Sequence, residues 1–214
     1  DEYLSEYIPP ENERLAWATG FTGSAGTAII RNNDATIFVD GRYTVQVKQQ
    51  VNDTIFNICQ LMEMPVTRWM KEKFANNTVL GYDPRLHRVN WIKNVNKLLK
   101  NKVKFVPINE NPIDIYWNDR PDPPIGKALL LDLKYTGISS LKKRKDMGEI
   151  ISNNKCDAAF ITRLDSIAWL LNIRGSDVPC NPVLLSHGII HANGNFDLFI
   201  NKSKIPIGFN KHVG

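Results

Sequence analysis

Two similar blocks recur at one fixed spacing in this chain of 214 residues. Ala16-Trp17 and Gly23-Ser24 in the first half return as Ala168-Trp169 and Gly175-Ser176 in the second. Each block is followed by a segment typical of a hairpin that ends in a similar strand, at 35–40 and 196–201. Either match alone is weak, but their common order and setting predict two copies of one fold.

A proline-rich stretch separates the two copies. Residues 118–124 hold Pro121, Pro123 and Pro124 and offer little that a core could bury, which is typical of a linker. We therefore expect domains at 1–120 and 121–214, a division that agrees with a domain size of roughly 100–200 residues. The second copy has a helix and a strand at 140–162 ahead of its Ala-Trp block. The first copy has almost nothing there, so we expect the first domain to lack its opening strand and helix.

Strands rich in β-branched and aromatic residues alternate with helical patterns, which predicts an α/β fold. In the helix at 91–99 the apolar residues with helical spacing are Trp91, Val95, Leu98 and Leu99. Asp165 or Ser166 can cap the helix that starts there, and Asn193-Gly194-Asn195 predicts a hairpin turn. The turn at 81–84 follows a strand at 78–80. Further strands are expected at 27–30, 35–39, 103–106, 128–133, 158–162, 183–185 and 196–200, and further helices at 43–50, 69–74, 140–152 and 165–172.

The composition excludes several classes of protein. The net charge of +5 is spread out, and the one dense basic run, 142–145, is typical of a solvated helix face. No nucleic-acid motif accompanies it, so we expect no nucleic-acid partner. Cys59, Cys156 and Cys180 are widely spaced, which fits a reducing compartment. The sequence contains no run of about 18 apolar residues, which a membrane-spanning helix would need. We therefore expect a cytoplasmic protein that does not enter the membrane.

No catalytic or metal-binding pattern stands out. The glycine-rich loop 20–26 lacks the spacing of a phosphate-binding loop and precedes a strand, so we interpret it as a structural turn. His187 and His191 lie on an expected strand, where four residues span about 13 Å, too far for one metal ion. Other acidic and histidine residues are in separate elements or isolated on the expected surface: Asp40, Asp165, Asp177, His87 and His212.

One candidate site remains, Asp40-Gly41-Arg42-Tyr43, at the C-terminal end of the strand 35–39. Ligands of open α/β sheets usually bind at that edge. Gly41 would allow a sharp turn, and Arg42 would project a guanidinium suited to a carboxylate or a carbonyl group. A surface ion pair between Arg42 and an aspartate, or a capping role, is the competing interpretation.

Long motifs resemble the N-terminal region of aminopeptidase P, the Xaa-Pro aminopeptidase family. The resemblance covers nearly the whole chain and is closest to the three-domain form of the family. It rests on segments 5–17, 20–28, 40–43, 115–121, 135–140 and 164–178, which include Gly20-Phe21-Thr22-Gly23-Ser24-Ala25-Gly26, Asp40-Gly41-Arg42-Tyr43 and Ile173-Arg174-Gly175-Ser176-Asp177.

The resemblance implies two creatinase-like N-terminal domains of the ribonuclease-H-like type, each with a mixed β-sheet flanked by helices. It implies a parent enzyme that removes the N-terminal residue from peptides with proline in second place. In that family two metal ions, expected here as Mn²⁺, activate water in a C-terminal pita-bread domain. That domain is absent from this sequence, so we expect no catalytic residue, no metal ligand and no activity in this chain.

The same resemblance gives roles to the parts that are present. The N-terminal domains of the family narrow the active-site entrance and support dimerisation. We therefore expect short proline-containing peptides, the protein's own catalytic domain and a second copy as partners. The family's Asp-Gly-Arg-Tyr arginine maps to Arg42, which implies a substrate-binding role. Trp17 and Trp169 are expected to be core packing residues. Two alternatives stay open: a non-enzymatic binding or dimerisation module, and a pita-bread relative that has lost its peptidase activity.

Overall fold

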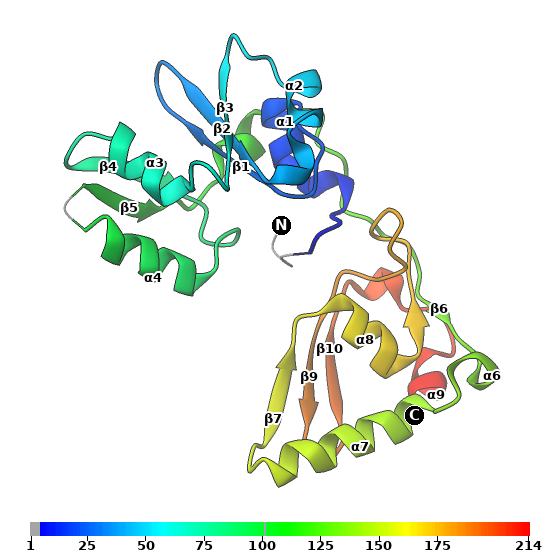
Figure 1. Cartoon of the computed structure of the whole chain (residues 1–214). Coiled ribbons are helices and arrows are strands. Elements are labelled where there is room, and N and C mark those ends of the chain that lie inside the picture. The colour runs from blue at the N-terminus through cyan, green and yellow to red at the C-terminus, as the bar shows by residue number, and fades with distance from the viewer. Residues whose placement is uncertain (1–4, 101) are drawn as a thin grey trace. The chain divides into compact units, whose positions relative to one another are not determined.

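A computed structural model describes residues 5–100 and 102–214. The chain divides into two compact units, which we describe separately (Figure 1). Unit 1 comprises residues 11–121 together with residues 5 and 6, whereas unit 2 comprises 122–214 together with Tyr7–Pro10. A domain boundary after residue 120 stays a prediction, and the first predicted domain includes residues 1–4 and 101, which lie outside the described residues.

Both units combine helices and strands, as the predicted α/β class requires. The elements from the N-terminus through unit 1 are η1 (Pro10–Asn12), α1 (Arg14–Thr19), β1 (Gly26–Ile30), β2 (Ala35–Val39), η2 (Gly41–Tyr43), α2 (Gln46–Gln50), β3 (Phe56–Gln60), α3 (Val66–Lys73), β4 (Thr78–Tyr82), α4 (Val89–Leu98), β5 (Val103–Pro107) and α5 (Pro112–Tyr116). Those of unit 2 are β6 (Leu129–Leu130), α6 (Leu133–Thr136), α7 (Ser140–Asn153), β7 (Ala158–Ile161), α8 (Leu164–Leu171), β8 (Ile173–Arg174), β9 (His187–His191), β10 (Phe196–Phe199), η3 (Lys202–Lys204) and α9 (Phe209–Val213).

Unit 1 is built around the mixed sheet β1-β2-β3, in which β2 runs antiparallel to β1 and parallel to β3. All five residues of β2 are buried, because apolar groups cover both faces of the sheet. On one face Ile37 packs with Phe21 and Val47. On the other, Phe38 meets the indole of Trp69 on α3 edge-to-face, with ring centroids 5.6 Å apart. A strand without regular alternation of polar and apolar residues, here with Thr36 as its one polar side chain, is what burial on two faces demands.

Unit 2 contains the antiparallel sheet β10-β9-β7. Gly194 adopts a φ of +83° in the turn between β9 and β10, so the predicted Asn-Gly hairpin is confirmed. Helices α7 and α8 pack on one face of this sheet, where Ile151 of α7 and Leu170 of α8 cluster with Ile190 of β9. In both units the repeated Ala-Trp helix is followed by a hairpin, as the internal repeat predicted.

Several predicted bounds differ from the structure. Residues 183–185 form no strand, and the strand expected at 128–133 is reduced to β6. Strand β4 continues through Gly81-Tyr82, which were predicted to turn. The helix expected at 43–50 is divided into η2 and α2. Helix α8 starts one residue early, because its N-cap is Arg163 rather than Asp165 or Ser166.

The amphipathic face of α4 was only partly predicted. Val95 and Leu99 are buried, whereas Trp91 and Leu98 are exposed and Ile92 takes their place in the core. Ile92, Val95 and Leu99 are spaced at i, i+3 and i+7, so they share the face that packs on the core, and Trp91 and Leu98 lie off this face.

The two repeated tryptophans are not core residues, which corrects the prediction. Trp17 is 41% exposed and stacks on Trp117 with ring centroids 5.9 Å apart. Trp169 is 51% exposed, and the Lys143 ammonium lies 4.5 Å from its ring centroid. In α8 the buried positions are instead taken by aliphatic neighbours such as Ile167 and Leu170. Both indoles therefore cover polar or aromatic neighbours at the rim of a core.

The basic run was predicted to be a solvated helix face, and this is wrong for its two central residues. Lys143 and Arg144 are buried on α7. The Arg144 guanidinium donates to the backbone carbonyls of Gly194 and Val213, at 3.0 and 2.7 Å. Burial lowers the pKa of this guanidinium. Arg144 thus ties α7 to the β9–β10 turn and to α9.

Candidate functional site at the end of strand β2

The end of β2 is closed by a capping interaction of Asp40. Its Oδ1 accepts a hydrogen bond from the backbone N–H of Arg42 at 2.9 Å, and its carbonyl oxygen accepts one from Tyr43 at 3.1 Å. These bonds turn the chain from β2 into η2. The expected turn is present at Gly41, but Gly41 lies outside the positive-φ region, so the turn needs no conformation that only glycine adopts. An aspartate N-cap suffices, since it satisfies a backbone donor that would otherwise lack a partner.

The Arg42 side chain projects from this turn and is held by Asp40. Its Nε lies 3.1 Å, and its Nη2 2.8 Å, from Asp40 Oδ2, and Nη1 lies 3.6 Å from Glu6 Oε1. The guanidinium carbon stands 5.2 Å from the Tyr43 ring centroid. The side chain remains 61% exposed. The predicted site residue is therefore oriented by its neighbours and still accessible to a ligand.

A short hydrogen-bonded chain joins this turn to the glycine-rich loop. The Tyr43 hydroxyl lies 2.8 Å from Ser24 Oγ and accepts from the Ser24 backbone N–H at 3.2 Å. Ser24 Oγ donates to Glu6 Oε1 at 3.2 Å. Gly20, at φ +80°, ends α1 ahead of the same loop. The loop is thus a structural turn, as predicted. It also supports the Arg42 site through Ser24, a role that sequence analysis did not predict.

The charges of the turn reinforce each other. The hydrogen bond from Arg42 lowers the pKa of Asp40, and the same bond raises the pKa of Arg42. Both groups therefore stay ionised at every physiological pH. Asp40 accepts from Nε and Nη2, whereas the contact of Nη1 with Glu6 is longer, at 3.6 Å. This arrangement can bind a carboxylate or polarise a carbonyl oxygen.

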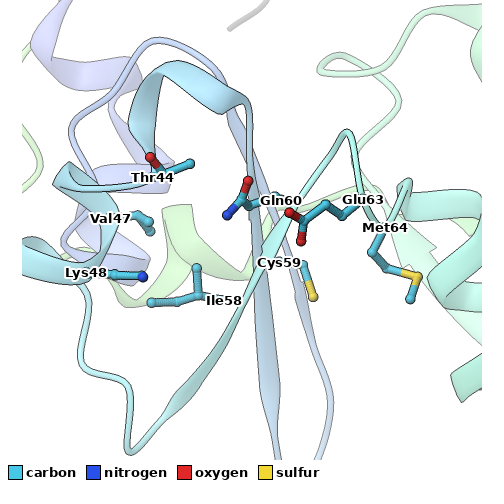
Figure 2. A pocket seen from close by; sticks show the side chains of 8 residues that line it. All are labelled: Thr44, Val47, Lys48, Ile58, Cys59, Gln60, Glu63 and Met64. Atoms are coloured by element: carbon cyan, nitrogen blue, oxygen red, sulfur yellow. The ribbon is translucent and has the colours of Figure 1, made fainter.

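A depression of about 310 Å³ lies nearby, between α2 and the edge strand β3 (Figure 2). Thr44, two residues beyond Arg42, belongs to its wall, and Lys48 and Glu63 place opposite charges on its rim. Burial raises the pKa of the Cys59 thiol, which makes this lining cysteine a poor nucleophile. Sequence reasoning missed this depression because its lining comes from three segments with no common motif: Thr44, Val47, Lys48, Ile58, Cys59, Gln60, Glu63 and Met64.

The other acidic and histidine candidates do not converge. His187 stacks on Phe160, while His191 pairs with Asp197 at 2.8 Å. His87 and His212 are half-buried rather than fully on the surface. One ring nitrogen of His87 lies 2.9 Å from the Asp83 carbonyl oxygen, and one of His212 lies 3.1 Å from that of Asn172. Within residues 5–100 and 102–214, no three His, Cys, Asp or Glu side chains are grouped so that they could hold a metal ion. The residues within these ranges therefore do not fit a metal centre.

None of the helices described here is both long and apolar enough to cross a lipid bilayer.

Comparison with known proteins agrees with the two-copy arrangement. Models of the Creatinase/Prolidase N-terminal domain match residues 1–114 and, in a second form, residues 119–214. The solved X-prolyl aminopeptidase of Caenorhabditis elegans superimposes with a TM-score of 0.90 at 31% identity. That match covers 99% of this chain and 35% of the nematode chain, which is described as a cytosolic enzyme with a di-nuclear active site.

Curated relatives give the same result. A probable Xaa-Pro aminopeptidase P of Aspergillus clavatus is 35% identical over the whole of this chain, and the match spans 33% of that protein. An Xaa-Pro aminopeptidase of Drosophila melanogaster is 34% identical over 99% of this chain and 35% of its own length. The chain spans about a third of the length of these relatives. By its sequence and its fold, it belongs to the creatinase/prolidase N-terminal domain family, in the tandem form found in aminopeptidase P.

Proposed function

We propose that this chain is the N-terminal accessory region of a metal-dependent aminopeptidase that removes the N-terminal residue from Xaa-Pro peptides. One observation carries the proposal: relatives named Xaa-Pro aminopeptidase align with all of this chain but only a third of themselves. The described residues offer no metal-binding cluster. Hydrolysis therefore belongs to a catalytic domain beyond this region, and the region itself serves to gate substrates and to support a homodimer.

The metal ions of the proposed enzyme are two divalent cations, with Mn²⁺ as our choice. Support comes from the nematode relative, which is described as having a di-nuclear active site. Two adjacent cations need several carboxylates and a histidine to neutralise and hold them. We place these ligands in the catalytic domain, and we place the enzyme in the cytoplasm. The domains of the accessory region are proposed as 1–120 and 121–214.

Arg42 is our candidate for contact with the substrate. Its side chain is exposed, carries a permanent charge and is oriented by Asp40. A fixed cation at the entrance of an active site can bind the carbonyl or carboxylate of a short peptide. Folded chains would be excluded by the walls of the same entrance, which gives selectivity for short proline-containing peptides.

Hydrolysis of a short Xaa-Pro peptide with Mn²⁺ tests the assignment. The chain described here and the longer polypeptide encoded by the same gene are assayed side by side. We expect turnover by the longer polypeptide alone. Turnover by neither, with metal bound in full, contradicts the proposal and favours an inactive relative or a binding module.

Arg42→Ala, made in the longer polypeptide, tests the substrate contact. We expect kcat/KM for the peptide to fall about tenfold to a hundredfold, because one charge-assisted hydrogen bond is lost. Metal content and unfolding midpoint should not change, since the side chain is exposed. Arg68→Ala is the matched control: this arginine is also exposed and paired, with Glu72 at 2.8 Å. Equal kinetics in both variants would remove Arg42 from the site.

A further inference from the structure

Strand β3 has an open edge in the described part of unit 1, where β2 is its one strand partner. The N–H of Leu61 donates to the Val39 carbonyl at 2.9 Å, so the backbone of Leu61 faces β2. Successive residues of a strand direct their backbone groups to opposite sides. The N–H and C=O of Ile58 and the N–H of Gln60 therefore face the open edge. The Gln60 carbonyl already accepts from the N–H of Glu63 at 3.1 Å.

The depression between α2 and β3 lies beside this edge (Figure 2). Ile58, Cys59 and Gln60 line it from β3, and Val47 and Lys48 line it from α2. A strand that adds to a sheet edge presents alternate side chains to each face of the sheet, so one set of them would enter this depression. Its volume of about 310 Å³ suits the side chains of a short peptide segment.

The surroundings of the edge suit peptides of varied sequence. Met64 lines the depression, and Met62 and Ile55, on the segments that flank β3, are 85% and 58% exposed. Methionine is flexible and polarisable, so it adapts to side chains of different shape. Lys48 and Glu63 carry opposite charges on the rim, and neither acidic nor basic peptides meet a field of one sign. Recognition would therefore depend on the main chain of the ligand.

The open edge is continuous with the Arg42 site. Gln60 of β3 is paired in register with Val39 of β2, and neighbouring strands lie about 4.8 Å apart. Asp40, which holds the Arg42 guanidinium at 2.8 Å, follows Val39 directly. Thr44, two residues beyond Arg42, belongs to the wall of the depression. A peptide whose carbonyl or carboxylate contacts Arg42 can therefore continue along β3.

We propose that the open edge of β3 binds the part of the peptide substrate that follows proline, as an added strand. This inference rests on the proposed function and adds a binding subsite to it. The main chain of the peptide bonds to Ile58 and Gln60, and its alternate side chains enter the depression beside α2. Proline has no N–H to give to a strand ladder, so the pairing falls to the residues after it.

A scan with N-methylated peptides tests the added strand in the longer polypeptide with Mn²⁺. A heptapeptide that begins Xaa-Pro is methylated at one backbone nitrogen at a time, at each residue after proline. The Ile58 carbonyl is the acceptor that faces the edge, so one peptide N–H should be needed. We expect KM to rise about tenfold at one position and by less than about twofold at its two neighbours, whose amides face away. Equal effects at consecutive positions, or none at any position, overturn the proposal.

Gln60→Pro removes a donor from the protein side of the same contact. Its N–H faces away from β2, so no ladder bond is lost, and proline is tolerated at such an edge position. We expect KM for the heptapeptide to rise about fivefold to tenfold, and KM for an Xaa-Pro tripeptide to change less. Gln60→Ala retains the N–H and is the matched control, in which the heptapeptide should keep its advantage. Equal loss of that advantage in both variants contradicts a main-chain contact.

Calorimetric titration of the metal-free longer polypeptide separates this inference from the proposed function. Heptapeptide binding with one methyl-sensitive position, but no turnover of any Xaa-Pro peptide with Mn²⁺, would support the strand site and overturn the proposed function. Turnover with equal KM for tripeptide and heptapeptide would overturn the strand site alone. Hydrogen exchange checks for another occupant: protection of the Ile58 and Gln60 amides that increases with protein concentration, without peptide, means that a second copy covers the edge and overturns the proposal.

Discussion

The ammonium of Lys204 lies 2.5 Å from Asp177 Oδ2, and both side chains are almost completely buried. The same oxygen accepts a hydrogen bond from the backbone N–H of Leu185 at 2.7 Å. This ion pair joins η3 to the loop that precedes β9. Neither residue belongs to the Arg42 site. We therefore interpret the pair as a buried structural ion pair that stabilises unit 2.

Asp177→Asn should destabilise unit 2 by about 3–5 kcal/mol, because it leaves the Lys204 charge buried without a counter-charge. Urea denaturation gives the free energy of unfolding. Lys202→Met, on the exposed side of η3, is the control and should change it by less than about 0.5 kcal/mol. The double variant Asp177→Leu with Lys204→Met should recover part of the loss. A loss under about 1 kcal/mol for Asp177→Asn would contradict the assigned role.

Asp83 should make unit 1 sensitive to acid. Burial raises the pKa of Asp83, but hydrogen bonds from Arg85 and Asn111 outweigh it and lower the pKa to about 2. The folded state therefore holds this proton less tightly than the unfolded chain, in which the pKa is 3.8. The stabilisation is complete above about pH 4, amounts to about 2 kcal/mol, and is lost as the pH falls towards 2.

The measurement is the unfolding midpoint in urea between pH 5 and 2, for the parent and for Asp83→Asn. Between pH 4 and 2, the urea midpoint of the variant should fall less steeply with decreasing pH than that of the parent, because the contribution of Asp83 is missing. Asp53→Asn, an exposed carboxylate in the same unit, should keep the parent's slope. Identical slopes in the parent and Asp83→Asn would exclude this assignment.

Lys143 should stabilise the C-terminal end of α8. Its ammonium donates to the Trp169 carbonyl at 2.9 Å and to Asn172 Oδ1 at 2.6 Å. Lys143→Met removes both bonds while keeping the aliphatic stem, so we expect a loss of about 1–3 kcal/mol. Lys142→Met, which breaks only an exposed pair with Asp146, should cost less than about 1 kcal/mol.

The pH dependence gives a further check on Lys143. Burial, followed by repulsion from Arg174, lowers the pKa of this ammonium below 10.5. The unfolded chain then binds the proton more tightly, so the contribution of Lys143 to stability increases as the pH rises towards 10.5. Lys143→Met should lack this rise relative to the parent. If Lys142→Met were the more damaging variant, the capping role would be wrong.

Gly148 should be intolerant of a side chain. A Cβ there would lie 2.7 Å from the Ala192 carbonyl oxygen and 2.8 Å from the Gly194 nitrogen, both backbone atoms. Gly148→Ala should therefore push α7 away from the hairpin turn and cost about 1–3 kcal/mol, although alanine favours helix. Gly41→Ala meets nothing within 4 Å and is the control, with little change expected. Thermal unfolding of both variants tests the prediction. Equal unfolding midpoints for Gly148→Ala and Gly41→Ala would show that the close approach at Gly148 does not limit its side chain.

Features set by neighbours along the chain were predictable. Strand β2 is a run of apolar residues with β-branched members, and the turn at Gly194 has the composition that a tight hairpin requires. The order of elements followed from the repeat. Arg42 was placed correctly at the end of β2, because an aspartate and a glycine after an apolar strand indicate a turn.

Features set by distant backbone groups were not predictable. Arg144 is buried because its partners are carbonyl oxygens of Gly194 and Val213, and any residue type offers a carbonyl. A local pattern of four basic residues carries no sign of them. In the same way, the contacts of Arg42 with Glu6 and of Tyr43 with Ser24 join segments far apart in sequence, so neither support of the site could be inferred from the motif alone.

The position of Trp169 makes unit 2 easy to observe by fluorescence. It is the only tryptophan between residues 122 and 214, whereas the other four, Trp17, Trp69, Trp91 and Trp117, belong to unit 1. The Lys143 ammonium of α7 lies 4.5 Å from its ring, and the indole is half-exposed to solvent. The fluorescence emission of Trp169 should therefore change when α7 separates from α8. A chain in which the other four are replaced by phenylalanine would report the opening of one unit as a single optical signal, separate from the other.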